Sequence, residues 1–200
     1  MQKQRERLRN LISRYVEEPG ARALRRLGLT PNTVTILGFI VTCLAAVIVA
    51  VGDLRVGALV FLVGGALDLF DGALARLTNK TTSFGAMLDS LMDRLGEAAL
   101  YLGLAVYALT VDPDSRNLTV FMSLLILALA TSQAVSYLRA RGEALGIDTR
   151  AGLMTRPERV VILSVALFLG EATTMLAMGF IAFFSTWTMV TRVIHIWRRL

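Results

Sequence analysis

The sequence predicts an all-α integral membrane protein with about six transmembrane helices and an N-terminal amphipathic helix on the membrane surface. Three observations support this fold class. The 200 residues are 55% hydrophobic with a mean hydropathy of +0.62, which is more apolar than is usual for a soluble domain of this length. Apolar stretches of about 20 residues, long enough to cross a bilayer, recur along most of the chain. Basic residues gather in the connections on one side.

Residues 1–28 are predicted to form a juxtamembrane element ahead of a six-span domain that covers residues 29–200. Apolar side chains recur here three and four positions apart among basic ones, which is typical of a helix on a membrane surface; they are Leu8, Leu11, Ile12, Tyr15 and Val16. A solvated basic tail is the alternative. We expect Pro19 and Gly20 to end this helix, because both residues interrupt helical structure.

The spans are predicted near residues 33–51, 55–77, 83–110, 117–141, 157–171 and 173–196. Thr30 and Pro31 precede the first span with the chemistry of a helix start, since proline suits the first helical turn. The polar residues at 81–83 are expected to cap the third span. The single cysteine, Cys43, lies within the first span, where packing is a better explanation than redox chemistry.

Charge sorts the connections into two sides. One side carries the N-terminal segment, Arg76 and Lys80, the stretch 139–159 and the basic C-terminus, whereas the other side holds only short links. The positive-inside rule then places both termini in the cytoplasm, in agreement with an even number of spans. We therefore expect a multi-pass protein of the cell membrane. Its net charge of +6 suits anionic lipid headgroups, and nucleic acid is not an expected partner.

Four aspartates interrupt the apolar sequence: Asp68, Asp71, Asp89 and Asp93. Residues three or four apart share a helix face, so each pair points one way from its own helix. A carboxylate in or near a membrane is costly and is kept mainly where it binds an ion, a proton or a substrate. Small residues that let a ligand or a helix approach accompany the aspartates; they are Gly72, Ala75 and Gly85. The pattern predicts a metal-centred active site between two helices.

The spacing D-x2-D-G-x2-A-R-x8-G-x3-D-x3-D over residues 68–93 resembles the signature of the CDP-alcohol phosphotransferase (phosphatidyltransferase) family, and every fixed position is filled. The resemblance implies a six-helix membrane enzyme, usually a homodimer, that displaces CMP from a CDP-linked lipid. It implies two divalent cations, Mg²⁺ or Mn²⁺, bound by Asp68, Asp71, Asp89 and Asp93, with Asp93 also acting as general base. The nucleotide-binding residues that it implies are Pro31, Asn32, Gly72, Ala75, Arg76 and Gly85.

Elementary chemistry agrees with this assignment. Mg²⁺ prefers oxygen ligands and commonly combines a few carboxylates with substrate phosphates. Two such ions can stabilise the attacking and the leaving oxygen of a phosphoryl displacement. An attacking alcohol must also lose its proton, which suits a carboxylate beside the metals. A structural or transport cation site is the alternative, but neither requires the adjoining Gly-x2-Ala-Arg segment.

The segment from 136 to 159 indicates the acceptor alcohol. Its Arg139-Ala140-Arg141 triplet and its Glu158-Arg159 pair resemble the phosphatidylinositol-phosphate synthases within that family, which join CDP-diacylglycerol to inositol 1-phosphate. The resemblance implies that three arginines bind the acceptor phosphate; they are Arg139, Arg159 and Arg192. Two positions depart from the pattern: Arg139 replaces a common lysine, and Pro157 replaces a small helix former.

Charge alone also favours a phosphorylated acceptor. Five arginines are predicted on the same membrane side as the aspartates: Arg139, Arg141, Arg156, Arg159 and Arg192. A phosphate dianion needs such cations, because the carboxylates would otherwise repel it. This argument does not separate inositol 1-phosphate from glycerol 3-phosphate, which is the runner-up acceptor.

A cation-coupled transporter is the rival from another class, but no internal repeat is visible. Glu97, one helical turn beyond Asp93, is placed to orient a nearby arginine.

Overall fold

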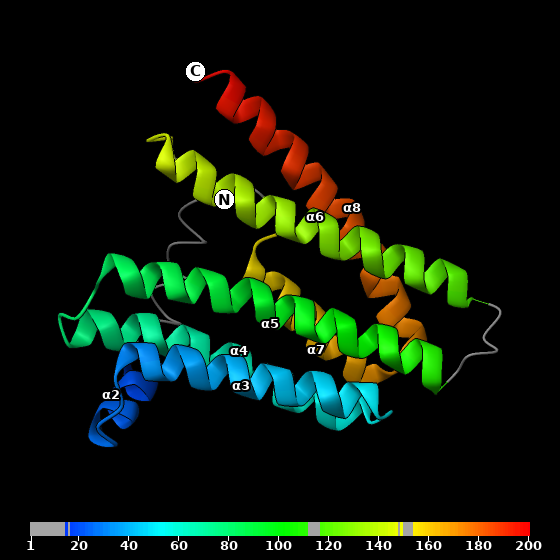
Figure 1. Ribbon diagram of the computed structural model, residues 1–200, viewed down its shortest axis with the longest axis horizontal. Helices are drawn as coiled ribbons and strands as arrows, with labels where there is room; N and C mark the ends of the chain where they lie inside the picture. The colour runs from blue at the N-terminus through cyan, green and yellow to red at the C-terminus, as the bar shows by residue number, and fades with distance from the viewer. Residues whose placement is uncertain (1–14, 16, 112–116, 148, 150–153) are drawn as a thin grey trace.

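The described part of the chain comprises residues 15, 17–111, 117–147, 149 and 154–200, and it is all-α, as predicted. Figure 1 shows this computed structural model. Its helices are α2 (Glu18–Arg26), α3 (Pro31–Ala50), α4 (Leu54–Leu77), α5 (Ser83–Thr110), α6 (Leu118–Ala144), α7 (Arg156–Leu169) and α8 (Glu171–Trp197). The last six follow the predicted spans to within a few residues.

By length and composition, four of the described helices can cross a membrane: α3, α4, α6 and α8. Helix α5 carries several charged residues in its first half, and α7 has only 14 residues. At 1.5 Å per residue, α7 is about 21 Å long, shorter than a bilayer core of about 30 Å. The protein is therefore an integral membrane protein by its apolar helices, while the number of six spans stays a prediction.

The N-terminal prediction is corrected in one respect. Pro19 lies in the first turn of α2, and the helix continues through Gly20 to Arg26, so the expected break at these two residues is wrong. Proline is tolerated in a first turn because its missing N–H would have had no helical partner there. Residues 1–14 and 16 lie outside the described part, so the amphipathic helix over residues 1–28 and the domain boundary after it stay predictions.

Helices α3, α4 and α5 pack closely because small residues line their contacts. A Cβ atom at Gly103 of α5 would overlap the carbonyl oxygen of Ala46 in α3. A Cβ atom at Gly64 of α4 would lie 2.5 Å from Thr42 Oγ1 of α3. Without side chains at these points, helix backbones approach far enough for extensive van der Waals contact. This packing holds the two helices that carry the aspartates against the same helix, α3.

Replacing Gly103 by Ala should therefore lower the thermal stability of the protein. The added methyl group has no room against the α3 backbone, and overpacking of this kind costs about 1–3 kcal/mol, equivalent to about 2–12 °C in Tm. Gly179→Ala is the matched control, because its Cβ would make only ordinary contacts with Leu124 at 3.9 and 4.0 Å. Thermal unfolding in detergent measures both variants. Equal Tm values for the two would contradict the packing argument.

A short connection aligns the two halves of the aspartate motif. Helix α4 ends at Leu77, and Asn79 in the turn that follows has a positive φ of 52°, which asparagine tolerates. Thr82 then caps α5, with its hydroxyl accepting a hydrogen bond from the Gly85 N–H at 3.0 Å. The predicted cap at 81–83 is confirmed at Thr82.

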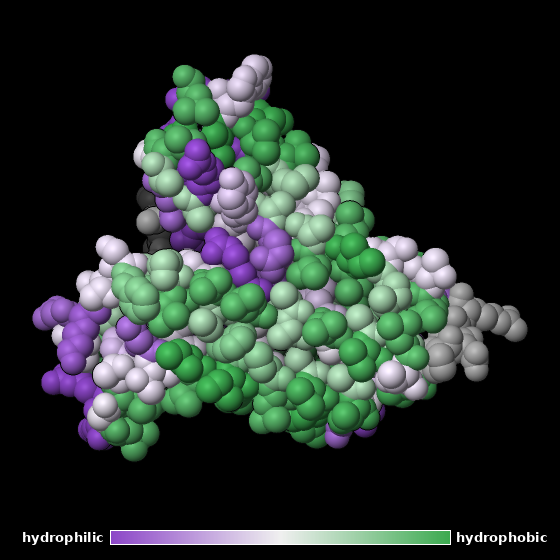
Figure 2. Space-filling view, in the orientation of Figure 1, coloured by the Kyte–Doolittle hydropathy of each residue, from purple (hydrophilic) through white to green (hydrophobic). Residues whose placement is uncertain are grey.

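The second part of the bundle is formed by α6 and α8, which pack against each other, with α7 in contact with both α4 and α8. Figure 1 shows α6 and α8 diverging from the α3–α5 group toward the end where α2 lies. In Figure 2, hydrophobic residues cover most of the visible face of α3–α5, while hydrophilic residues gather at that end and where α5 and α6 separate. Polar chemistry is thus concentrated at one end of an apolar bundle.

Candidate active site

The four aspartates lie where α4 ends and α5 begins, as predicted. Asp68 and Asp71 belong to α4, and Asp89 and Asp93 belong to α5. Asp71 is buried, with 5% of its surface exposed, and the other three are partly buried. Three cavities border this cluster, and Asp89 lines all three of them. The three cavities therefore meet at Asp89.

Side chains from two other helices hold three of the aspartates. Thr35 of α3 donates its hydroxyl to Asp71 Oδ2 at 2.5 Å. Arg156, the first residue of α7, donates from Nη2 to Asp68 Oδ2 at 2.6 Å and also forms an ion pair with Asp93. The Arg156 guanidinium therefore bridges the carboxylates of α4 and α5.

Neither role was assigned from the sequence, because the hydrogen-bonded partners lie 36 and 88 positions apart. The sequence nevertheless places both residues among segments that were expected near the site. Thr35 closes the segment that begins with Pro31 and Asn32, and Arg156 belongs to the group of arginines expected at this end of the bundle. Only the packing of α3 and α7 against α4 shows which aspartate each one contacts.

The donor set suits hard divalent cations. Its four carboxylates come from two adjacent helices, and one cationic group, the Arg156 guanidinium, already bridges two of them. Among the described residues, no three acidic, histidine or cysteine side chains are oriented toward one common point in the manner of a metal site. Asp68 and Asp93 point toward Arg156, and Asp71 points toward Thr35. The individual metal-ligand assignments therefore stay predictions.

All six residues predicted to bind nucleotide line one cavity of about 210 Å³ between α3, α4 and α5: Pro31, Asn32, Gly72, Ala75, Arg76 and Gly85. Asp71 and Asp89 border the same cavity. At Gly85 a Cβ atom would lie 3.1 Å from Asn32 Oδ1, so the glycine keeps this space open. Arg76 donates to Glu17, just before α2, at 2.9 Å.

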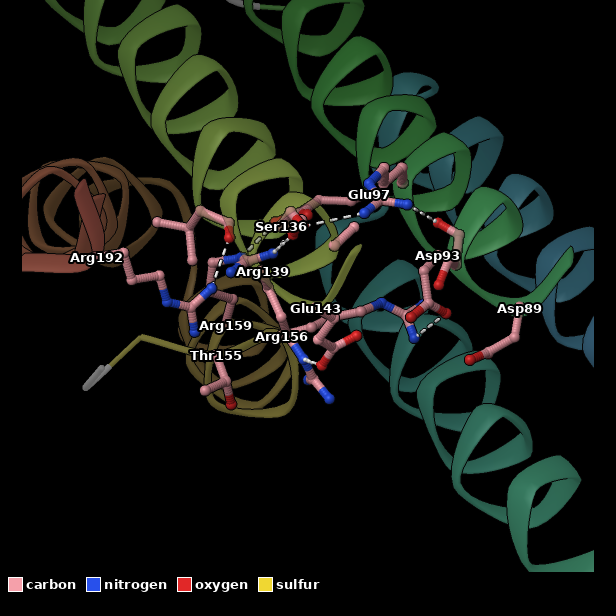
Figure 3. A pocket seen from close by; sticks show the side chains of 14 residues that line it. Asp89, Asp93, Glu97, Ser136, Arg139, Glu143, Thr155, Arg156, Arg159 and Arg192 are labelled. Atoms are coloured by element: carbon pink, nitrogen blue, oxygen red, sulfur yellow. Dashed lines mark hydrogen bonds and ion pairs between the residues drawn. The ribbon is translucent and has the colours of Figure 1, made fainter. Parts of the chain in front are cut away.

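The three arginines predicted for the acceptor line a second cavity, of about 170 Å³, between α5, α6, α7 and α8 (Figure 3). Five arginines border it: Arg94, Arg139, Arg156, Arg159 and Arg192. Four carboxylates also border it: Asp89, Asp93, Glu97 and Glu143. Cations thus face the space beside the aspartates, as an anionic ligand requires.

These three arginines differ in their surroundings. Arg139 is half exposed and pairs with Glu143 on its own helix at 3.0 Å. Arg192 is buried, and its Nη1 donates to the carbonyl oxygen of Val135 at 2.6 Å. Arg159 is fully buried and donates to both oxygens of Glu97. The packing therefore fixes two of the three guanidinium groups before any ligand arrives.

A third cavity, of about 330 Å³, runs between α4 and α7 and ends at Asp68, Asp89 and Asp93. Apolar residues form most of the rest of its lining: Leu62, Gly65, Ala66, Leu69, Pro157, Val160 and Val161. Leu62 and Val161 are exposed at 46% and 53%, on the flank of an apolar helix bundle. A hydrocarbon chain attached to a polar head at the aspartates fits this groove.

The family model of CDP-alcohol phosphatidyltransferases matches residues 28–197. The chain belongs to this family. Membership confirms the family resemblance of the aspartate motif, and it makes the protein a metal-dependent membrane transferase rather than a transporter.

Similar family members are synthases of inositol phosphate lipids. The phosphatidylinositol phosphate synthase of Mycolicibacterium smegmatis is 37% identical over 186 residues, which cover 89% of this chain and 82% of the relative. The archaetidylinositol phosphate synthase of Methanothermobacter thermautotrophicus is 35% identical over 181 residues, covering 88% and 87%. Both are similar along nearly their whole length, so the likeness extends beyond the aspartate motif.

Crystal structures of the Mycobacterium tuberculosis phosphatidylinositol phosphate synthase have the same fold. One contains CDP-DAG and matches with a TM-score of 0.80 and 33% identity, covering 91% of this chain and 94% of that chain. Another, in complex with manganese and citrate, has the same TM-score and identity and covers 91% and 89%. The expected divalent cation therefore has a counterpart in a relative. The homodimer and the individual residue roles stay predictions.

Proposed function

We propose that this protein transfers the phosphatidyl group from CDP-diacylglycerol to inositol 1-phosphate and releases CMP. The observation that carries the proposal is the meeting of three cavities at Asp89. One cavity carries the six predicted nucleotide-binding residues, one is bordered by five arginines, and one has a mostly apolar lining away from the aspartates. These chemistries match the three parts of the reaction, namely a nucleotide, a phosphorylated acceptor and a lipid tail.

The lipid donor would occupy two of the cavities at once. Its cytidine nucleotide would lie between α3, α4 and α5, with Arg76 beside its phosphates, and its acyl chains would follow the groove between α4 and α7. Asp68, Asp71, Asp89 and Asp93 would hold two divalent cations where the diphosphate sits between these cavities. When bound, such cations supply charge stabilisation for the diphosphate and the leaving CMP.

The acceptor would enter the arginine-lined cavity, with Arg139, Arg159 and Arg192 binding its phosphate. Guanidinium groups suit this task because their planar donor sets match phosphate oxygens. Inositol 1-phosphate is favoured over glycerol 3-phosphate because the bacterial and the archaeal relative both carry inositol phosphate in their names. The two relatives differ in the lipid part of their names, phosphatidyl in one and archaetidyl in the other, but both names contain inositol phosphate.

Asp93 is the general base of this proposal. It borders the acceptor cavity and the lipid groove but not the nucleotide cavity, so it lies on the acceptor side of the reacting phosphorus. Asp93 would take the proton of the inositol hydroxyl as that oxygen bonds to the phosphorus that carries diacylglycerol. The bond from this phosphorus to the bridging oxygen breaks in the same displacement, and the electron pair leaves with CMP.

We further propose that this end of the bundle faces the cytoplasm of the cell membrane. Basic residues gather there on α2, at the α4–α5 turn and at the C-terminal ends of α6 and α8, as the positive-inside rule requires. A water-soluble acceptor would then reach its cavity from the cytoplasm, while the lipid enters sideways from the bilayer. Two copies of the chain would form the functional unit.

A single assay tests the proposed reaction. Purified protein in detergent, supplied with CDP-diacylglycerol and Mn²⁺, should release CMP when inositol 1-phosphate is added. Inositol without its phosphate should support little release, because the arginine-lined cavity then has no anion to bind. Release with glycerol 3-phosphate but not with inositol 1-phosphate would show that the acceptor assignment is wrong, whereas no release with any alcohol would contradict the transferase assignment itself.

A further inference from the structure

Glu97 and Arg159 form a buried ion pair beside the arginine-lined cavity. Glu97 lies on α5 one helical turn beyond Asp93, and 6% of it is exposed; Arg159 lies on α7, and 1% of it is exposed. Arg159 donates from Nε to Glu97 Oε1 at 2.6 Å and from Nη2 to Glu97 Oε2 at 2.8 Å. Both residues border the cavity, where Figure 3 shows them among its lining side chains.

The geometry of this pair fixes the orientation of one guanidinium group. Two parallel hydrogen bonds to one carboxylate hold the planar group far more tightly than a single bond does. A buried guanidinium without a partner would also be expensive, so Glu97 offsets the cost of burying the charge of Arg159 inside the bundle. By contrast, the Arg139–Glu143 pair is half exposed and lies within one helix, where such a pair contributes little.

Arg159 retains donor capacity for a ligand. Its Nη1 reaches the carbonyl oxygen of Met154 at 3.4 Å, and its Nη2 reaches the Ser136 hydroxyl at 3.5 Å. Both contacts are long for hydrogen bonds, so an approaching phosphate oxygen can replace them with a shorter one. The strong contacts to Glu97 use the other edge of the guanidinium and remain in place.

We propose that Glu97 is a positioning residue for the phosphorylated acceptor: it holds the Arg159 guanidinium in a fixed orientation, and through Arg159 it sets the affinity for the acceptor phosphate. The inference rests on the proposed function, because it requires an acceptor with a phosphate group. It also explains why a carboxylate lies among the cations of this cavity, since Glu97 offsets the mutual repulsion of Arg159, Arg139 and Arg192. Glu97 touches neither the nucleotide cavity nor the lipid groove.

The test compares Michaelis constants for both substrates in wild type and in Glu97→Gln. The substitution keeps the size of the side chain, removes its charge, and removes one of the two oxygens that accept hydrogen bonds from Arg159. The acceptor KM should rise about tenfold, which corresponds to about 1.4 kcal/mol, while the KM for CDP-diacylglycerol and kcat change less than about twofold. Arg159→Lys, which keeps the charge but loses the planar fork, should raise the acceptor KM in the same way.

A double variant shows whether Glu97 acts through Arg159. In the Arg159→Lys background, adding Glu97→Gln should raise the acceptor KM no further, because the oriented guanidinium is already lost. Tyr101→Phe is the control for disturbance of the buried α5 surface. Tyr101 lies one turn beyond Glu97, is fully buried and borders none of the three cavities, so its substitution should leave both KM values unchanged.

The outcomes separate this inference from the proposed function. A Glu97→Gln variant that loses kcat or thermal stability with an unchanged acceptor KM would show a structural pair only and would overturn the inference. If Glu97→Gln fails to fold, an unchanged acceptor KM in Arg159→Lys would overturn it equally. Wild-type turnover with glycerol 3-phosphate alone would overturn the inositol assignment instead, and the same KM comparison with glycerol 3-phosphate would then decide the role of Glu97.

Discussion

Asp93→Asn should lower kcat about 10³-fold while leaving the nucleotide bound, because the amide cannot accept the proton of the attacking hydroxyl. Asp93 borders the acceptor cavity and the lipid groove, and it does not line the cavity that carries the predicted nucleotide residues. CMP release under saturating substrates measures kcat, and equilibrium binding of CMP measures the nucleotide site. The dissociation constant of CMP should change far less than kcat, because the three other aspartates proposed to hold the cations remain in place.

Two results would contradict this assignment. Activity of Asp93→Asn near the wild-type level would exclude Asp93 as the base. A parallel loss of CMP binding and activity would show that the residue supports the nucleotide site rather than proton transfer. Because Asp93 also pairs with Arg156, the thermal stability of the variant has to be measured beside its activity.

Asp89→Asn is expected to cause the second largest loss of activity, because it should weaken binding of the divalent cation. Asp89 is the residue that all three cavities share, so a cation bound there would contact both substrates. Loss of its charge should lower kcat about 100-fold, equivalent to about 2.7 kcal/mol, and should raise the Mn²⁺ concentration required for half-maximal activity. A Mn²⁺ titration followed by electron paramagnetic resonance measures binding without turnover and should show weaker binding.

Asp53→Asn serves as the matched control for this experiment. Asp53 caps α4 at the opposite end of the bundle, where its carboxylate accepts a hydrogen bond from the Val56 N–H at 3.1 Å. Asparagine is an equally good capping residue, so both activity and Mn²⁺ binding should stay at wild-type levels. Unchanged Mn²⁺ binding in Asp89→Asn would show that this carboxylate is not a metal ligand.

Much of the fold was predictable because membrane helices have local signatures. Apolar length, helix caps such as Thr82 and charge at the helix ends located six helices to within a few residues. The prediction of a helix break at Pro19 was wrong, because Pro19 lies in the first turn of α2. Proline can either end a helix or begin one, and the sequence pattern alone does not distinguish these two possibilities.

The candidate site was predictable in part for a related reason. Residues three or four apart on one helix must share a face, so each pair of aspartates was expected to act together. In the structure, Asp68 and Asp93 from different helices share Arg156, and Asp71 contacts Thr35. The family resemblance then assigned six nucleotide-binding residues, and all six line one cavity. The separation of the site into three cavities was not predictable, since it depends on how α6, α7 and α8 diverge from the other helices.

Amino-acid order was thus sufficient for the helices, the aspartate motif and the enzyme family, because each depends on residues close together along the chain. The packing of distant helices settled the rest. Thr35 meets Asp71 across 36 positions, Arg159 meets Glu97 across 62, and Arg156 meets Asp68 across 88. Contacts of this kind arise when the packed helices bring separate segments within hydrogen-bond distance, and no spacing along the sequence encodes which partners will meet.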